Sequence, residues 1–228
     1  MPRFSIIVPV LDEARAIEAS LAVLQPWREA GVAEVVVADG GSGDATRALA
    51  TPLADRVIDA PCGRAAQMNA GARSSRGESI LFLHADTILP QGAAAAVGRA
   101  LETRAWGRFD VTISGAHPML AVIAFFMNAR SRLTGIATGD QAMFMRRSAF
   151  DSIGGFPAIP LMEDVAISKA LKRISPPACL RERAVTSGRR WERHGALRTI
   201  LLMWRLRLAY ALGADPKTLA RRYDGRSA

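Results

Sequence analysis

Hydrophobic residues in the first half of the chain alternate between short continuous runs and a helical spacing. Apolar runs of strand length occur at residues 4–8, 34–38, 56–58 and 79–83. Apolar positions recur every three to four residues, the period of a helix, over residues 13–30, 65–72 and 92–104. Strands that alternate with helices predict an α/β fold, in which helices cover both faces of a mostly parallel sheet.

The pattern becomes less regular after a further strand predicted at residues 109–114. Helices are predicted at 120–130, 163–173 and 195–212, a strand at 142–145, and a break at Pro176 and Pro177. With half of its residues hydrophobic, the chain can bury the core of one large domain. Only the tail beyond Asp224 is expected to be disordered.

The chain is strongly basic, with a net charge of +9, and arginine supplies almost all of this charge because there are only three lysines. Arginine binds phosphates and carboxylates through forked hydrogen bonds. An anionic nucleotide, an anionic membrane surface and nucleic acid all fit this charge. We expect no nucleic-acid partner, because no recognised nucleic-acid motif accompanies the arginines. Many of them are equally compatible with an ordinary solvated face.

Cysteine usage and hydrophobic run lengths bear on location. Cys62 and Cys179 lie far apart and form no CxxC pair, which favours a reducing, cytoplasmic setting. The first residues lack the pattern of a signal peptide. The longest apolar stretch, residues 119–127, has nine residues, whereas a spanning helix needs roughly 17 to 25. We expect a protein that does not cross a membrane and is either free in the cytoplasm or peripheral on the inner membrane face.

Polar side chains follow two of the predicted strands where these end. Asp39 ends the run 34–38 and precedes a glycine loop, and His84 and Asp86 follow the run 79–83. Both positions fall at the carboxyl edge of the sheet, where open α/β folds bind ligands. The glycine loop matches neither the dinucleotide fingerprint nor the GxxxxGK[ST] loop. Asp39 suits hydrogen bonds from a base or a ribose, or the loop is a turn in which Asp44 caps the next helix.

Three further side chains have both a chemical and a structural interpretation. Asp86 can ligate a divalent ion that bridges the phosphates of a nucleotide. His84 is either a hydrogen-bonded scaffold residue or a ligand. Glu163 and Asp164 open the helix at 163–173, where acids favour the helix dipole even without a catalytic role.

Six segments occur in a characteristic order: PVLDE (9–13), VADGGS (37–42), GRAAQMNAG (63–71), HAD (84–86), GDQ (139–141) and ED (163–164). Together they resemble the family 2 glycosyltransferases, from residue 4 to about residue 170. The segment RWERHG (190–195) further resembles a small bacterial subgroup, labelled transferase 2 of selenodomain- or arsenosugar-associated clusters. That label describes a genomic neighbourhood and not a reaction.

The resemblance implies a GT-A fold and a role for each matching residue. The nucleotide would be bound by Pro9, Leu11, Glu13, Asp39, Gly40, Arg64 and Asp86. Asp140, Gln141 and Trp191 would face the donor sugar or the acceptor, although Trp191 is also suited to anchoring the last helix. Asp86 and His194 would hold Mg²⁺ or Mn²⁺, and His84 stands where the family's metal motif has its first acid. Asp164 would be the catalytic base, with Glu163 beside it.

The implied activity is transfer of a sugar from a nucleotide-diphosphate sugar to an acceptor hydroxyl, with inversion and with a divalent metal. A sugar-nucleotidyltransferase is the enzymatic alternative, but it would usually begin with a glycine- and arginine-rich phosphate loop in place of residues 9–13. A non-catalytic basic module on a membrane surface would explain the arginines. It would leave Asp39, Asp86 and Asp164 unexplained.

We expect the chain to consist of a GT-A domain, residues 1–190, and a C-terminal helical extension packed on it, residues 191–228. The helix predicted at 195–212 has more apolar surface than one stripe, mixed with Arg198, Arg205 and Arg207. Three explanations remain open: burial against the chain's own domain, contact with a membrane surface and a lipid acceptor, or a homodimer seam. The acceptor is accordingly either a small molecule or a lipid.

Overall fold

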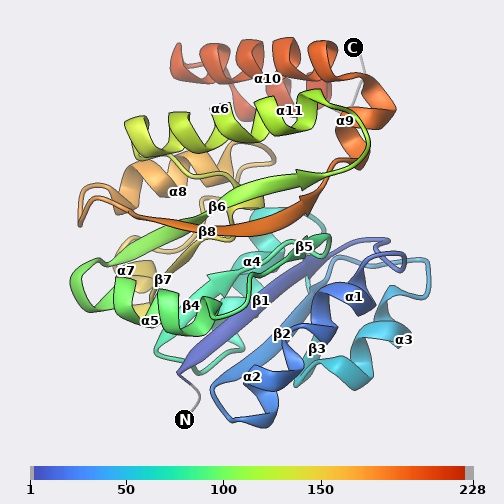
Figure 1. Ribbon diagram of the computed structural model, residues 1–228, viewed down its shortest axis with the longest axis vertical. Coiled ribbons are helices and arrows are strands. Elements are labelled where there is room, and N and C mark those ends of the chain that lie inside the picture. Colours follow the sequence, from blue (N-terminus) through green and yellow to red (C-terminus); the bar gives the residue numbers. More distant parts are fainter. Residues whose placement is uncertain (1–2, 224–228) are drawn as a thin grey trace.

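The computed structural model describes residues 3–223, without the side chain of His194. The tail predicted to be disordered lies outside these residues. Within them, eight strands form one sheet in the order β3-β2-β1-β4-β7-β6-β8-β5 (Figure 1). The strands are β1 (Phe4–Val10), β2 (Ala33–Asp39), β3 (Arg56–Asp59), β4 (Ser79–Phe82), β5 (Thr87–Ile88), β6 (Trp106–Ser114), β7 (Phe144–Arg146) and β8 (Ala178–Ser187).

The first four strands are parallel, as the alternating pattern predicts. β1 pairs with β2 on one side and with β4 on the other, and β3 pairs with β2. Every residue of β1 and β2 is buried, because helices cover both faces of a parallel sheet. The register places Val10 opposite Asp39. The residues that follow these strands therefore meet at one edge of the sheet.

The other half of the sheet is mixed. β7 is antiparallel to both β4 and β6, β6 runs parallel to β8, and β5 is antiparallel to β8. The sequence pattern did not predict β8, a strand of 10 residues. Arg181, Arg183 and Val185 are exposed along it, while Ala184 and Thr186 are buried. Charged residues on the exposed face concealed the alternation that marks a half-buried strand.

Helices cover both faces of the sheet, as predicted. They are α1 (Ile17–Ala22), α2 (Gln25–Glu29), α3 (Thr46–Ala50), α4 (Arg64–Arg73), α5 (Ala93–Thr103), α6 (Met119–Thr134), α7 (Arg147–Ser152), α8 (Glu163–Leu171), α9 (Arg189–His194), α10 (Ala196–Ala211) and α11 (Pro216–Tyr223). Successive β1 residues contribute to different cores. Ile6 and Val8 pack in the core under α1 and α5, whereas Ile7 packs in the core under α4, α7 and α8. This alternation follows from the two-residue period of a strand.

One helical prediction needs correction, and some short helices were not predicted. The helix predicted at 13–30 is two short helices, because the chain breaks between α1 and α2 and Pro26 lies near the start of α2. Proline suits the first turn of a helix, where its missing N–H needs no partner. The short helices α7, α9 and α11 were not predicted.

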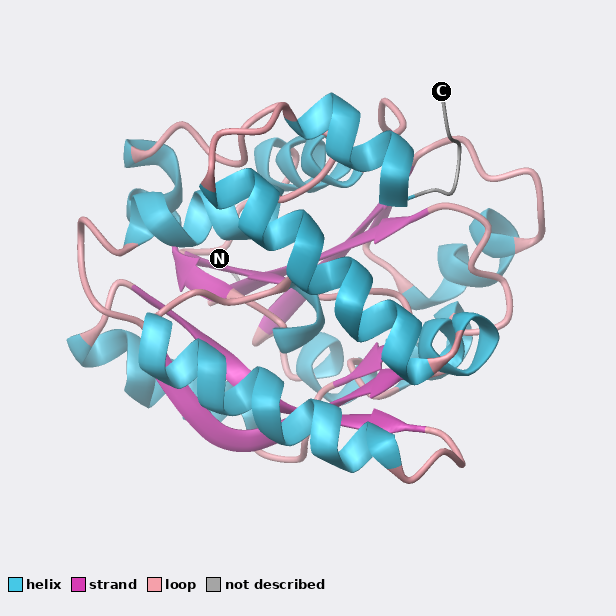
Figure 2. Cartoon of the chain, turned by 90° about the horizontal axis from the view of Figure 1, so that it is seen from above, coloured by secondary structure: helices cyan, strands magenta, loops and turns pink. Residues whose placement is uncertain are grey.

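The C-terminal helices pack on the rest of the molecule in two places (Figures 1 and 2). Trp191 and Ala196 pack with residues of β6 and α6. Leu206 of α10 and Leu219 of α11 pack on Met162, the residue before α8. None of the helices within residues 3–223 has the length and apolar character needed to span a membrane.

Candidate functional site

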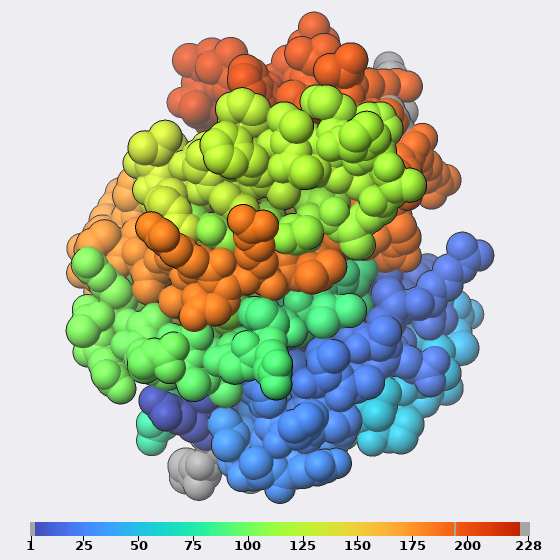
Figure 3. Space-filling view, in the orientation of Figure 1, coloured from blue at the N-terminus to red at the C-terminus, as the bar shows by residue number. Residues whose placement is uncertain are grey.

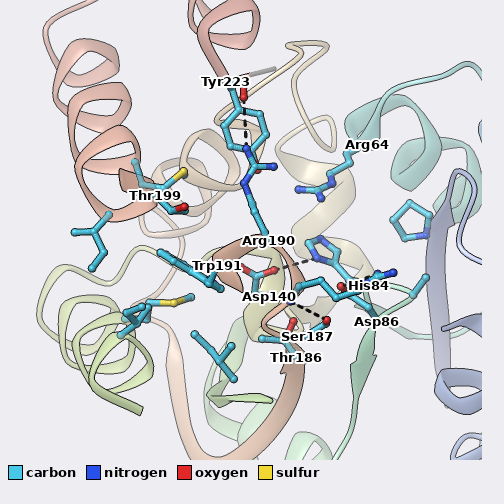
Figure 4. Close-up of a pocket in the computed structure, with 18 of the residues that line it drawn as sticks. Arg64, His84, Asp86, Asp140, Thr186, Ser187, Arg190, Trp191, Thr199 and Tyr223 are labelled. Carbon is cyan, nitrogen blue, oxygen red and sulfur yellow. Dashed lines mark hydrogen bonds and ion pairs between the residues drawn. The ribbon is translucent and has the colours of Figure 1, made fainter. Parts of the chain in front are cut away.

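A cavity of about 850 Å³ opens at the carboxyl edge of the parallel strands. Residues from the ends of β1 and β4, the start of α4, a short turn at Gly139–Gln141, α9, and the facing sides of α6 and α10 line it. In Figure 4 the side chains of Arg64, His84, Asp140 and Arg190 converge on this space from four separate segments. Of the predicted site residues, those that line it are Pro9, Leu11, Glu13, Arg64, Asp86, Asp140 and Trp191.

The loops after β1 and β2 hold each other in place beside this cavity. The Asp12 carboxylate accepts a hydrogen bond from the Gly43 N–H at 2.8 Å, and the Asp12 N–H donates to Ser42 Oγ at 3.0 Å. Asp12 adopts a positive φ of 54°, a conformation that asparagine and aspartate tolerate best among residues other than glycine. The reciprocal bonds therefore fix the course of the chain between Pro9 and Glu13.

Asp39 is buried at the end of β2 and is not among the residues that line the cavity. Its Oδ1 accepts hydrogen bonds from the Gly41 N–H at 3.2 Å and from the N–H and hydroxyl of Ser42 at 2.9 and 2.7 Å. Its Oδ2 lies 4.0 Å from Arg47. One oxygen thus shapes the glycine loop and the other has hydrogen-bonding capacity left.

Gln67, in α4, connects the two strand ends and was not singled out from the sequence. Its amide Nε2 donates to the carbonyls of Val10 at 2.7 Å and Ala38 at 3.0 Å. The side chain lies against Gly40, where a Cβ would come within 3.0 Å of the amide. Gly40 therefore permits close packing of the loop on α4 and, like Asp39, does not line the cavity.

His84 binds Asp140 and packs on Gly139. Its Nδ1 lies 3.3 Å from Asp140 Oδ1, a pair drawn as a dashed line in Figure 4. Burial opposes ionisation of Asp140, yet the hydrogen bond from His84 and the charges of Arg64 and Arg207 hold the pKa of Asp140 below its ordinary value. His84 thus orients an acid that faces the cavity, in keeping with the scaffold interpretation of this residue.

Gly139 leaves room for the His84 ring, because a Cβ at this position would overlap the imidazole. We expect Gly139→Ala to lower the free energy of unfolding by about 1–3 kcal/mol, the usual cost of overpacking. Chemical denaturation measures this change. Gly43→Ala is the control, since its Cβ would meet one atom at an ordinary 3.9 Å. Equal stability of the two variants would contradict close packing of His84 on Gly139.

Glu163 and Asp164 form the first turn of α8, next to His84 and Gly139 rather than on the wall of the large cavity. Asp164 Oδ2 accepts a hydrogen bond from the Gly139 N–H at 3.3 Å. Burial, and then the charge of Asp164, raise the pKa of Glu163 to about 7. Met162 precedes them with a φ of 69°, a strained conformation that often marks functional sites.

Arg189 joins Glu13 and Asp86 across the cavity. Its Nη2 lies 2.8 Å from Glu13 Oε2 and 3.2 Å from Asp86 Oδ2. The guanidinium shows that a cation fits between these two carboxylates. Mg²⁺ is commonly held by one or two carboxylates together with substrate phosphates, so the oxygen donors present fit such an ion. The described residues contain no cluster of three or more metal-ligating side chains.

The remaining predicted residues lie in different surroundings. Gln141 is buried, and its Oε1 accepts a hydrogen bond from the Thr138 N–H at 3.2 Å within its own turn; it does not line the cavity. Trp191 lines the cavity and also packs against the core formed by β6 and α6. The position of the His194 side chain lies outside the described part of the structure, so its metal-binding role stays a prediction.

Several cavity residues were missed because their partners are distant in sequence. Arg189 and Glu13 are 176 positions apart, and no local pattern connects them. Arg130 and Arg207 could have been found from the sequence, because each continues the three-to-four-residue spacing of an apolar helix face and so should lie on the same side of the helix. Tyr223 had none; its ring lies 3.6 Å from the guanidinium carbon of Arg190.

Comparisons with known proteins agree with this architecture. A model of the family described as Glycosyl transferase family 2 matches residues 5–154. No curated protein matches the sequence. Similar solved structures include S. aureus TarS 1-349 in complex with UDP-GlcNAc, with 17% identity and a TM-score of 0.64. The similarity covers 82% of this chain and 58% of that one.

Two further structures share the fold. Mannosyltransferase PcManGT from Pyrobaculum calidifontis, in complex with GDP-Man and Mn²⁺, is 21% identical with a TM-score of 0.64, over 100% of this chain and 65% of that one. Glucosyl-3-phosphoglycerate synthase from Mycobacterium tuberculosis, in complex with Mn²⁺, UDP and glucosyl-3-phosphoglycerate, is 18% identical with a TM-score of 0.58, over 81% and 71%. These similarities confirm the predicted GT-A-like α/β fold. The chain spans about 60% of the length of the TarS 1-349 structures and 37% of the longer TarS structure.

Proposed function

Because this chain belongs to glycosyl transferase family 2, we propose that it moves a sugar from a nucleoside-diphosphate sugar to an oxygen atom of an acceptor. The observation that carries the proposal is the lining of one cavity by carboxylates and arginines from distant segments. Asp86 and Asp140 lie there with Arg64, Arg189 and Arg190. Arginines suit a diphosphate, and carboxylates suit sugar hydroxyls or a metal.

We assign the nucleotide to the end of the cavity at β1 and α4. Pro9, Leu11, Glu13 and Arg64 line this end, and Asp39 and Gly40 shape the loop beside it. Burial opposes the charged form of Arg64, but the charges of Asp140, Glu163 and Asp164 favour it, and the pKa of Arg64 lies above its ordinary value. A positive charge held in this place suits the departing diphosphate.

We assign the acceptor end to Asp140 and Trp191, which line the cavity, with Gln141 fixing the turn that presents Asp140. Asp164 lies next to this turn, where it accepts a hydrogen bond from the Gly139 N–H, and we propose that it reaches the acceptor from there. The acceptor oxygen attacks the anomeric carbon opposite the leaving group, and the bond from that carbon to the diphosphate oxygen breaks. The acceptor's proton passes to Asp164 and the nucleoside diphosphate leaves with the bond's electron pair. A single displacement of this kind inverts the anomeric centre. Glu163 lies beside this base, and the charge of Asp164 contributes to the raised pKa of Glu163.

A divalent metal fits the oxygen donors around Asp86. We propose that Asp86 would hold Mg²⁺ or Mn²⁺, with His194 as a second ligand, and that a bound ion would neutralise charge on the diphosphate. The solved structures of similar fold that contain Mn²⁺ or Mg²⁺ with a nucleotide support this assignment. Arg189 would then exchange its contact with Asp86 for one with the diphosphate.

We further propose the chain's subgroup and domain division. The segment 190–195 supports membership of the subgroup labelled selenodomain- or arsenosugar-associated transferase 2. Packing of α10 and α11 on Met162 supports a catalytic domain at residues 1–190 with an extension at 191–228 that braces the start of α8.

Thermal unfolding with a panel of nucleoside diphosphates, with and without Mn²⁺, tests donor binding. We expect one nucleotide to raise the midpoint in a metal-dependent way, because a ligand at 100 times its dissociation constant stabilises the folded state by about 2.7 kcal/mol. Asp39→Asn should reduce the shift while preserving the loop, since the amide oxygen of asparagine can still accept the hydrogen bonds from the N–H and hydroxyl of Ser42. Asp86→Asn should remove its metal dependence.

The control for both variants is Asp151→Asn, which alters an exposed residue of α7. It should leave the nucleotide shift unchanged. A panel in which no nucleotide shifts the midpoint at millimolar concentration would contradict the proposed donor site.

A further inference from the structure

α6 and α10 lie next to each other at the top of the molecule (Figures 1 and 3). Residues of both helices line one end of the large cavity, which we call the groove between α6 and α10. Each helix presents one apolar face to it. The lining residues are Met119, Val122, Ile123, Phe126 and Met127 on α6, and Ile200, Met203 and Trp204 on α10. Their spacing of three to four residues keeps them on one side of each helix.

Both apolar faces end in an arginine that also lines the cavity, Arg130 on α6 and Arg207 on α10. From Met119 to Arg130 the face extends about 16 Å, at 1.5 Å per residue. The inner end of the groove is therefore basic and its walls are apolar. The same end approaches the acids proposed for catalysis, since the charge of Arg207 acts on Asp140 and that of Asp164 acts on Arg130.

The two arginines are poorly compensated by the described residues. Arg130 Nε and Nη2 and Arg207 Nε are buried without a hydrogen-bond partner there, and Arg130 makes one hydrogen bond, to the Ile136 carbonyl at 3.3 Å. Burial, and then the charge of Arg207, lower the pKa of Arg130 to about 10. Two neighbouring cations with unfilled hydrogen bonds are stabilised by an anion placed beside them.

The outer rim of the groove is apolar and exposed. Large hydrophobic side chains at the surface of the two helices are Val122, Phe125, Phe126, Leu133, Leu197, Leu201, Trp204, Leu208 and Leu212. Trp204 is 71% exposed and Phe126 62% exposed, although both also line the cavity. Exposed apolar surface of this extent indicates a site of interaction.

We propose that the acceptor is an amphiphile whose apolar chain lies in the groove between α6 and α10, whose phosphate is anchored by Arg130 and Arg207, and whose hydroxyl, separate from the phosphate, is the attacking oxygen. This inference rests on the proposed glycosyl transfer and names its acceptor class. A phosphate monoester carries close to two negative charges at neutral pH, which complements two guanidinium groups. A second copy of the chain fits less well, because a symmetric contact would bring this basic, apolar face against itself.

Binding of alkyl phosphates tests the proposal without requiring turnover. Tryptophan fluorescence reports it, since Trp191 and Trp204 both line the cavity. The probes are dodecyl phosphate, octyl phosphate, dodecanol and inorganic phosphate, each below its micellar concentration. We expect dodecyl phosphate to bind most tightly, with affinity rising by up to about four-fold for each methylene that the groove covers. Dodecanol and inorganic phosphate should each bind at least about ten-fold more weakly.

Neighbouring residues on the same helices provide matched variants. Arg207→Gln should weaken dodecyl phosphate at least about ten-fold and leave dodecanol unchanged, whereas Arg205→Gln, at an exposed position outside the cavity lining, should change neither. Phe126→Ser should weaken both alkyl probes more than Phe125→Ser does, because Phe126 lines the groove and Phe125 does not. Arg207→Lys keeps the charge and should give an intermediate affinity.

Three outcomes overturn the inference. Equal affinity for dodecyl phosphate and dodecanol would contradict a phosphate site at Arg130 and Arg207. Equal effects of the Phe125 and Phe126 variants would contradict binding of the apolar chain in the groove. Dimerisation on light scattering that Phe125→Ser abolishes, without alkyl phosphate binding, assigns the face to a second copy. The nucleotide thermal shift, measured on the same samples, separates the failures. A retained shift without alkyl phosphate binding overturns only the acceptor class, and a lost shift overturns the proposed function with it.

Discussion

Replacing Asp164 with asparagine is expected to lower kcat by about 10²–10⁴-fold, the range associated with loss of a general base. Asparagine has almost the same shape and its oxygen still accepts the hydrogen bond that the Gly139 N–H donates to Asp164 at 3.3 Å. It cannot take the proton of the acceptor. Initial-rate kinetics with the donor sugar identified by thermal unfolding measure the loss. Nucleoside-diphosphate affinity should remain within about two-fold, because Asp164 acts at the acceptor end and not at the nucleotide end.

The control is Asp151→Asn, an exposed change on α7 that should leave kcat unaltered. If kcat of Asp164→Asn falls by less than about ten-fold, Asp164 is not the base. Loss of nucleotide binding in the same variant would instead indicate a damaged fold.

Local sequence patterns were sufficient for the parallel half of the sheet. β1, β2 and β4 are continuous apolar runs because both faces of these strands are buried, and the acids after them follow from chain direction alone. The same reasoning failed at β8, which faces solvent with Arg181 and Arg183 and depends on pairing with β6. A strand stabilised by a distant partner leaves a weak local signal.

The predicted site likewise contains residues that local patterns identified and residues that depend on distant contacts. Glu13, Asp86 and Asp140 line the cavity as single side chains that the motif order places there. Their partner Arg189 could not be predicted from the sequence. Arg189 contacts Glu13 and Asp86 because β8 pairs with β5 and so brings the chain after β8 to this edge of the sheet. Contact between residues so far apart is a property of the folded chain.

Glu163 predicts an unusual dependence of stability on pH. Its pKa is raised from 4.5 to about 7, first by burial and then by the charge of Asp164. Below pH 4.5 the carboxyl is protonated in both folded and unfolded chains and costs nothing. Between pH 4.5 and 7 it ionises first in the unfolded chain, so the folded state loses about 3 kcal/mol of stability across this window. The loss is complete above pH 7.

Glu163→Gln removes this titration. We expect the variant to equal the wild type in free energy of unfolding near pH 4.5 and to exceed it by about 2–3 kcal/mol at pH 8. Urea denaturation at a series of pH values gives the difference curve, in which the titrations of groups that do not interact with Glu163 cancel. Glu102→Gln, on the exposed side of α5, should give a flat difference curve. A flat curve for Glu163→Gln as well would mean that Glu163 titrates normally in the folded state. The Glu163 carboxyl would then be accessible to water, which contradicts the buried position that it holds beside Asp164.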